Sequence, residues 1–169
     1  GVLRQEAPGI SPRFQLQHSL PARSGTGKVL VAQLSQGEDQ RPDVLLQASS
    51  AGMLLGFLQG PQEAPGSIGA FEAALELDLG QSPSDVAAGD LTGDGLPDLA
   101  VGLRGEPVVG VLCQKQEGGF GRSFAQGVLL GGSDSQHFRV AVGDVSGDAR
   151  PELVIVRTLE REIKIVRTR

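Results

Sequence analysis

Several residue types are missing or scarce in this chain, and each absence excludes a class of protein. The 169 residues include no Trp, no Tyr and no Asn, so there is no N-glycosylation sequon and little aromatic surface for a sugar ring. The single cysteine, Cys113, excludes a disulfide framework within one chain, and its apolar surroundings in VVGVLC indicate a buried side chain. No apolar run approaches the roughly 18 residues of a membrane span.

Basic residues are also too few for a nucleic-acid partner. The chain has 15 Lys and Arg against 20 Asp and Glu, which gives a formal net charge of -5 and no basic stripe. Phosphate binding depends on clustered Lys and Arg, so we expect no nucleic acid. The chain opens with GVLRQEAPG and its only Met is Met53, so we expect that any targeting segment has been removed.

The chain does contain an acidic stretch between two short apolar runs, at 90–102, which reads DLTGDGLPDLAVG. A hard cation such as Ca²⁺ prefers roughly six to eight oxygen ligands, and a short loop with a glycine can supply them from alternate residues. The flanking runs are bounded by Gly and Pro, which indicates two strands joined by the loop. The expected donors are the side chains of Asp90, Thr92, Asp94 and Asp98 and the carbonyl oxygen of Leu96.

A metal-free hairpin turn is the alternative interpretation of the same loop. Asp, Gly, Thr and Pro are ordinary turn residues. However, three carboxylates at loop positions 1, 5 and 9 would repel one another unless a cation neutralised them, which favours the metal site. The loop is not an EF-hand, because it lacks the closing Glu and the flanking helices.

The acidic stretch recurs, which makes the chain a repeat protein. Residues 86–102 align without a gap with residues 140–156, 54 positions later. A weaker copy, with a loop two residues longer, lies around Pro42 and Asp43 and keeps too few carboxylates for a cation. In the third copy the equivalent donors are Asp144, Ser146, Asp148, the carbonyl oxygen of Arg150, and Glu152.

The third loop departs from the second at two positions. Ala149 replaces the loop glycine, which costs on the order of 1 kcal/mol if the position requires a positive φ. Glu152 replaces the closing Asp, so a longer carboxylate must fit the same cage. The third loop is therefore either a second cation site or a turn without metal.

Short strands at even spacing, separated by Gly, Pro and Ser turns, predict an all-β repeat array. We expect one domain, residues 1–169, with repeats at about 28–79, 84–130 and 138–169 and a first strand at 12–20 that completes the last blade. Propellers close with about four to eight blades, so we expect either ring closure between identical chains or a longer parent chain. The other expected strands are 28–34, 43–48, 53–59, 71–79, 84–90, 98–103, 108–114, 122–130, 138–144, 152–157 and 162–169.

These patterns resemble the FG-GAP or VCBS repeat, which also builds the propeller head of integrin α chains. The resemblance rests on VAAGDLTGDGLPDLAVG at 86–102, the VVGVLCQ run that follows, and the GGFG segment at 118–121. It implies a β-propeller blade with Ca²⁺ on the loop between the first two strands, in secreted or surface proteins. Asp90, Asp94 and Asp98 match the family's ligand positions, while Thr92 replaces the usual Asn.

We therefore expect a non-catalytic extracellular, cell-surface or periplasmic module for binding, assembly or cell adhesion, with structural Ca²⁺ and a protein or glycan ligand. One alternative is a lectin-like propeller, which the absence of Trp and Tyr weakens. The other is the propeller part of a larger secreted hydrolase or lyase with paired carboxylates as acid and base. Each conspicuous Asp already belongs to a cation loop, which weakens the second alternative.

Other motifs carry less information. SGTGKV at 24–29 lacks the glycine that a phosphate-binding loop needs at position 22, and a strand pattern follows where a helix should. His18 and His137 lie in different repeats without a patterned acid or nucleophile, and a dyad of Cys113 with His137 has no support. The charged tail at 159–169 alternates polar and apolar residues, as a half-exposed strand does.

Overall fold

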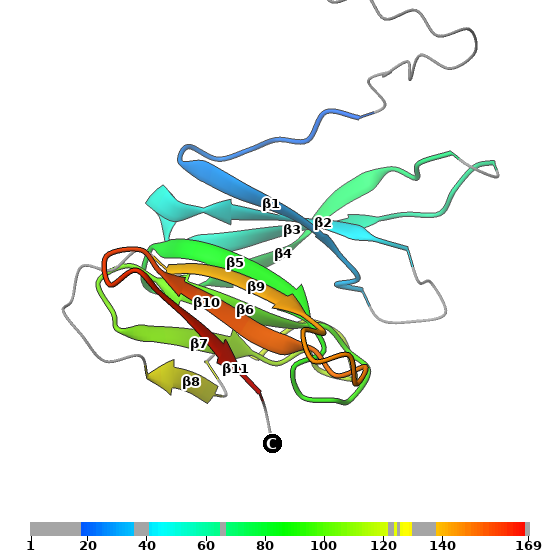
Figure 1. Cartoon of the computed structure of the whole chain (residues 1–169). Helices are drawn as coiled ribbons and strands as arrows, with labels where there is room; N and C mark the ends of the chain where they lie inside the picture. Colours follow the sequence, from blue (N-terminus) through cyan, green and yellow to red (C-terminus); the bar gives the residue numbers. More distant parts are fainter. Residues whose placement is uncertain are drawn as a thin grey trace, which may run out of the picture.

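The computed structural model shows an all-β molecule, as the sequence predicts. Within the described residues, eleven strands form three antiparallel sheets, and the only helical element is a short 3-10 turn, η1 (Ser49–Ala51). Figure 1 shows that the sheets follow one another in chain order. Those residues form no closed ring of sheets and no helix long and apolar enough to cross a membrane. The described residues are 18–35, 41–64, 67–121, 124, 126–129 and 138–167.

The first sheet is a four-stranded meander in which each strand pairs with the next. Its first strand alternates half-buried and exposed side chains, because only one face of that strand packs on the second sheet. The strands of this sheet are β1 (Thr26–Ala32), β2 (Asp43–Ala48), β3 (Met53–Gln59) and β4 (Phe71–Asp78).

The second sheet repeats the meander and lies in the middle of the stack. All six residues of its second strand are buried, because a neighbouring sheet covers each face. The strands are β5 (Pro83–Gly89), β6 (Asp98–Leu103), β7 (Val108–Leu112) and β8 (Gln126–Leu129).

The third sheet has three strands among the described residues, in the order β11-β10-β9. Of the strand expected at 12–20, residues 12–17 lie outside the described part, and residues 18–20 form no strand. The strands of the third sheet are β9 (Phe138–Gly143), β10 (Glu152–Arg157) and β11 (Glu162–Val166).

Two apolar clusters join the sheets face to face. Leu45 and Leu54 of the first sheet and Leu99 of the second are fully buried in one cluster. Phe138 and Ile155 of the third sheet are fully buried against the second sheet in the other. Hydrophobic burial between neighbouring sheets is therefore what holds the stack together.

A buried carboxylate on β5 adds polar contacts to this packing. Asp85 forms an ion pair with Lys28 of β1, with 2.9 Å between Oδ1 and Nζ. Its Oδ2 accepts a hydrogen bond of 2.9 Å from the backbone N–H of Val140 on β9. Asp85 therefore connects the first strands of all three sheets.

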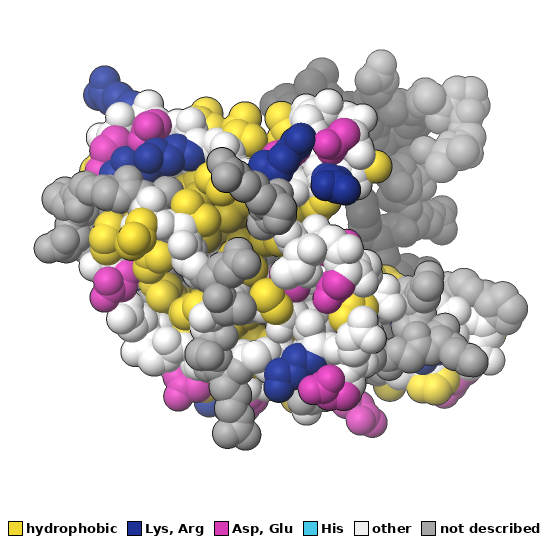
Figure 2. Space-filling model, turned by 90° about the horizontal axis from the view of Figure 1, so that it is seen from below, with side chains coloured by type: hydrophobic (Ala, Val, Ile, Leu, Met, Phe, Trp, Pro, Cys, Tyr) yellow, Lys and Arg dark blue, Asp and Glu magenta, His cyan; other side chains and the backbone are white. Residues whose placement is uncertain are grey.

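Apolar side chains also lie open on the surface. Seen from the side of β8 and the C-terminal end of β11, hydrophobic side chains gather over the centre of the molecule (Figure 2). The exposed large apolar residues include Leu129 on β8 and Ile163 and Ile165 on β11. The second and third sheets therefore leave apolar side chains open to solvent among the described residues.

The predicted strands at 43–48, 53–59, 98–103 and 152–157 begin and end as the sequence indicates. The run at 28–34 differs, because the structure places β1 at Thr26–Ala32. Leu34 and Ser35 donate their N–H groups to the Asp43 carboxylate, at 2.7 and 2.8 Å, and not to the neighbouring strand. A side-chain acceptor therefore ends this strand early.

Candidate metal centre

The two loops predicted to bind cations lie side by side at one end of the second and third sheets (Figure 1). They border a common hollow of about 330 Å³. Asp90 and Thr92 line it from one loop, Ala149 and Arg150 from the other, and Arg167 from the end of the third sheet. Equivalent loops of two repeats, 54 residues apart in the sequence, therefore lie next to each other.

The first of these loops folds around the carboxylate of Asp90. Its Oδ1 accepts the N–H groups of Gly93 and Asp94, at 2.7 and 3.1 Å, and its Oδ2 accepts that of Gly95 at 2.9 Å. Gly93 and Gly95 have φ values of 79° and 85°, which glycine adopts without strain. The loop conformation therefore depends on Asp90 and on glycine at both of these positions.

The other expected donors of this loop differ in exposure. Asp94 and Thr92 are exposed, and Asp94 Oδ1 accepts the N–H of Leu96 at 2.9 Å. Asp98 is fully buried: its Oδ2 accepts the N–H of Thr92 at 2.9 Å and its Oδ1 that of Gln114 at 3.1 Å. Asp98 therefore ties the loop to the end of β7.

Asp43 makes the same contacts in the first repeat, where the sequence predicts no metal. Its Oδ2 accepts the N–H groups of Leu34 and Ser35, and its Oδ1 accepts that of Gln59 at 2.8 Å. Gln59 lies 16 residues after Asp43, as Gln114 lies 16 residues after Asp98. The closing carboxylate thus satisfies buried backbone donors whether or not a cation is expected nearby.

The third loop repeats this fold around Asp144. Its Oδ1 accepts the N–H groups of Gly147 and Asp148, at 2.6 and 3.2 Å, and its Oδ2 accepts that of Ala149 at 2.8 Å. Ala149 has a φ of 65°, in the left-handed region that disfavours side chains. This position does require a positive φ, so the strain that the sequence predicts for Ala149 in place of glycine is present.

A cation from the chain itself occupies the third loop. Arg167 contacts Glu152 and the Ser146 hydroxyl, and its guanidinium lies 3.2 Å from Asp148 Oδ2. The Arg167 bond, with help from the N–H of Val145, lowers the pKa of Glu152 to about 2. Three of the five residues predicted as ligands of this loop are therefore bonded to Arg167, which the sequence did not single out.

The donors of both loops are oxygens only, the type that Ca²⁺ prefers. Within the described residues, however, no three His, Cys, Asp or Glu side chains converge as they would around a metal ion. In the second repeat the carboxylates of Asp90, Asp94 and Asp98 accept backbone N–H groups instead. The donor chemistry fits Ca²⁺, and binding would require Asp94 and Asp98 to share one ion with Asp90.

Other candidate groups do not form a site. Burial, and next the nearby Asp98 and Asp94 charges, raise the pKa of the Cys113 thiol, which disfavours a reactive thiolate. The ring of His18 packs edge-on against Phe71, and His137 lies outside the described residues. The segment at 24–29 leads into β1, which excludes the phosphate-binding loop.

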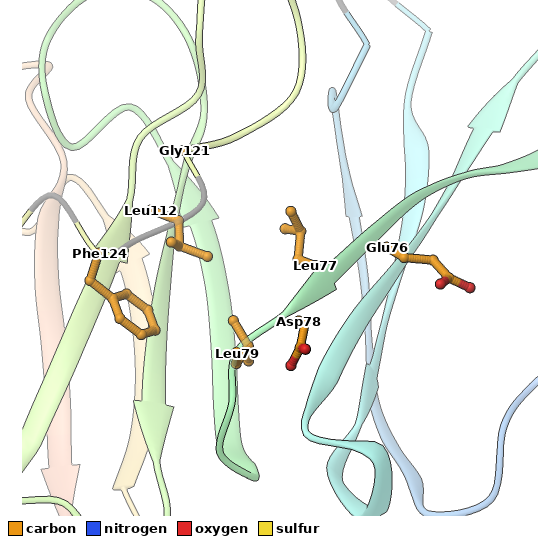
Figure 3. A pocket seen from close by; sticks show the side chains of 7 residues that line it. All are labelled: Glu76, Leu77, Asp78, Leu79, Leu112, Gly121 and Phe124. Atoms are coloured by element: carbon orange, nitrogen blue, oxygen red, sulfur yellow. The ribbon is translucent and has the colours of Figure 1, made fainter.

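A larger cavity, of about 560 Å³, opens between the first and second sheets. Figure 3 shows Leu77 and Leu79 at the end of β4 on one side of it and Leu112 and Phe124 on the other. Glu76 points away from it. Its leucine and phenylalanine side chains continue the packing between the sheets, and Asp78 lines it beside Leu79.

Three stacked antiparallel meanders, two of them with an acidic loop between their first two strands, define an all-β repeat protein. Residues 82–119, which include β5, β6, β7 and the Asp90 loop, match the FG-GAP repeat. The segment that forms β5, β6 and β7 therefore matches an FG-GAP repeat, which confirms the resemblance found in the sequence. No curated protein matches the chain.

Proposed function

We propose that this protein is a non-catalytic binding module in which one Ca²⁺ stabilises the loop from Asp90 to Asp98. The FG-GAP repeat supports a propeller-type binding module, because its match covers this loop and both flanking strands. The donors would be Asp90, Thr92, Asp94, Asp98 and the Leu96 carbonyl oxygen. The ion would neutralise the loop carboxylates and fix the hairpin.

The observation that carries this proposal is the contrast between the two loops. Both fold around a first Asp in the same way, but the third loop has Arg167 as its cation. Within the described residues no Lys or Arg forms an ion pair with Asp90 or Asp94. The second loop therefore has uncompensated carboxylates where a cation is expected.

For the third loop we propose no Ca²⁺ while Arg167 is in place. The guanidinium already bonds Asp148 and Glu152, so a metal ion would have to displace it. The third loop is then stabilised by an internal cation and not by a metal ion. It contains the predicted donors Asp144, Ser146, Asp148, Arg150 and Glu152.

The affinity would be weak, with a Kd of roughly 10⁻⁴ to 10⁻³ M as in extracellular modules. Such a site is filled where Ca²⁺ is millimolar and empty where it is scarce. We therefore propose an extracellular, cell-surface or periplasmic location, with the ligand bound on another surface of the stack.

The test is calorimetric titration of the full chain with CaCl₂, followed by thermal melts. At about 10 mM Ca²⁺ these Kd values give roughly 1.4–2.7 kcal/mol of added stability. Asp94→Asn should abolish the heat of binding and the shift in melting temperature, because it removes a charged ligand of the ion. The loop itself should stay folded, since the amide oxygen can still accept the Leu96 N–H. The matched change in the third loop, Asp148→Asn, should leave both unchanged. A wild-type chain that neither binds Ca²⁺ nor gains stability from it would refute the proposal.

A further inference from the structure

The outer face of the third sheet is the repeat equivalent of a face that is buried inside the stack. On the second sheet, Val109 and Val111 are 0% and 6% exposed, because the third sheet covers them. Their equivalents 54 residues later, Ile163 and Ile165 on β11, are 67% and 58% exposed. The third sheet therefore presents a blade-packing face that no described residue covers in the same way.

Other residues on this outer face of the third sheet are also more exposed than their equivalents on the second sheet or share the face with Ile165. The strand register places Val154 of β10 opposite Ile165, so the two side chains share a face. Val145 is exposed, whereas its equivalent in the second repeat, Leu91, is buried. We call the surface made by Val145, Val154, Ile163 and Ile165 the trailing face.

The first sheet carries the opposite half of such a junction. Val86 on β5 and Val140 on β9 are 0% and 4% exposed, because the preceding sheet covers each of them. Their equivalent on β1, Val29, is 56% exposed. Val31 lies two residues along the same face, and the register places Val29 opposite Leu46. We call the surface made by the exposed Val29 and Val31, with the buried Leu46 beside them, the leading face.

The segment before β1 supports this assignment. Leu20 packs against the leading side of the first sheet, near Phe57 and Phe71. Leu77, 57 positions later, packs against the leading side of the second sheet near Leu112 (Figure 3). Each of these leucines lies six positions before the first strand of the sheet it covers. Leu20 therefore covers part of the first sheet in the way that Leu77, from the preceding sheet, covers the second. The strand β1 is the part of this side of the first sheet that stays open.

We propose that the trailing face of one copy of this chain packs on the leading face of a second copy. The chain already makes this contact twice, between its first and second sheets and between its second and third. Exposed apolar side chains remain on both halves of one more such contact in the same chain, so two copies can pack head to tail. Two copies with three sheets each would close a six-bladed ring, within the roughly four to eight blades of propellers.

This inference does not depend on Ca²⁺, because no loop donor belongs to either face. Its test is the solution mass of the full chain by light scattering in chelator, with the expected result twice 17.5 kDa. Ile165→Asp on the trailing face and Val31→Asp on the leading face should each weaken association at least about 100-fold, by burying an unpaired carboxylate. Leu159→Asp, at an exposed apolar position in the turn between β10 and β11, is the matched control and should leave the mass unchanged.

Mixing the two variants separates this arrangement from one in which two identical faces pair with each other. In an equimolar mixture, the intact leading face of Ile165→Asp meets the intact trailing face of Val31→Asp, so a one-to-one dimer should form although each variant alone is a monomer. A monomeric wild-type chain would overturn the proposal. Association that survives Val31→Asp but not Ile165→Asp would also overturn it and would indicate pairing of two trailing faces. Circular dichroism of each variant verifies that it is folded.

Discussion

Replacing Ala149 with glycine should stabilise the protein, although the change removes a side chain. Ala149 has a φ of 65°, while its equivalent in the second repeat, Gly95, has a φ of 85°. A left-handed conformation costs a non-glycine residue roughly 1–2 kcal/mol. Glycine also has more conformational freedom in the unfolded chain, which lowers the stability of the folded state by about 0.4–1 kcal/mol. The net gain expected for Ala149→Gly is therefore about 0.5–1 kcal/mol.

The assay is urea unfolding followed by far-ultraviolet circular dichroism, since the chain has no Trp or Tyr for intrinsic fluorescence. The midpoint should rise with an unchanged slope, and the melting temperature should rise by about 1–4 °C. The reverse change, Gly95→Ala, has open space for its Cβ and should lose a similar amount of stability. Measurements in chelator remove any effect of a bound cation. If Ala149→Gly leaves the midpoint unchanged or lowers it, the argument from backbone strain is wrong.

Two further predictions concern buried charges. Asp85→Asn should lower the free energy of unfolding by about 1–3 kcal/mol in urea, because it removes the ion pair with Lys28 and weakens the bond to β9; an unchanged midpoint would show that Asp85 does not join the sheets. Arg167→Gln should raise the pKa of Glu152 from about 2 toward 4.5, measured by NMR titration of the carboxyl group. The lowered pKa in the wild-type chain stabilises the folded state above about pH 4.5, and this contribution is lost as the pH falls toward 2. The variant should lack that loss, and a Glu152 titration that Arg167→Gln does not change would contradict the assigned cause.

The strands could be predicted because the sequence pattern of each strand recurs in more than one repeat. The runs at 98–103 and 152–157 occupy equivalent positions in two repeats, and both become strands with the predicted bounds. Turn residues at the ends of these runs limit where each strand can stop. The repeat spacing also placed Asp90 and Asp144 on equivalent loops, which the structure brings side by side.

Arg167 could not be identified in the same way. It follows β11 in a tail whose alternating pattern indicates a half-exposed strand. Its contact with Glu152 spans 15 residues and depends on how β10 pairs with β11, not on a local motif. A long flexible side chain can reach several partners, so its choice is decided by tertiary packing. The one available signal was the third loop itself, which carries the acidic residues but has lost the loop glycine.

The role of the closing carboxylate, at Asp43, Asp98 and Glu152, could be predicted only in part from the sequence. The Pro-Asp pair at 42–43 recurs at 97–98, yet the first loop has too few acidic residues to indicate a cation. Hydrogen bonds from Leu34 and Gln59 explain why Asp43 is buried there all the same. A pattern of acidic residues shows where charge accumulates, but it does not separate ligands of a metal from acceptors of backbone N–H groups.

The three loops can be understood as three solutions to one electrostatic problem. Each repeat buries an acidic side chain that holds the loop against the end of the third strand, and a buried charge needs compensation. In the first repeat, hydrogen bonds from the N–H groups of Leu34, Ser35 and Gln59 compensate Asp43. In the third repeat, Arg167 compensates Glu152 together with Asp148. The loop of the second repeat has as many carboxylates as that of the third, three in each, but no comparable side-chain cation among the described residues, so we propose a bound ion as their counter-charge. Calcium dependence should therefore follow the loop without an arginine, and Arg167→Gln offers the direct check, because it should make the third loop sensitive to Ca²⁺ as well.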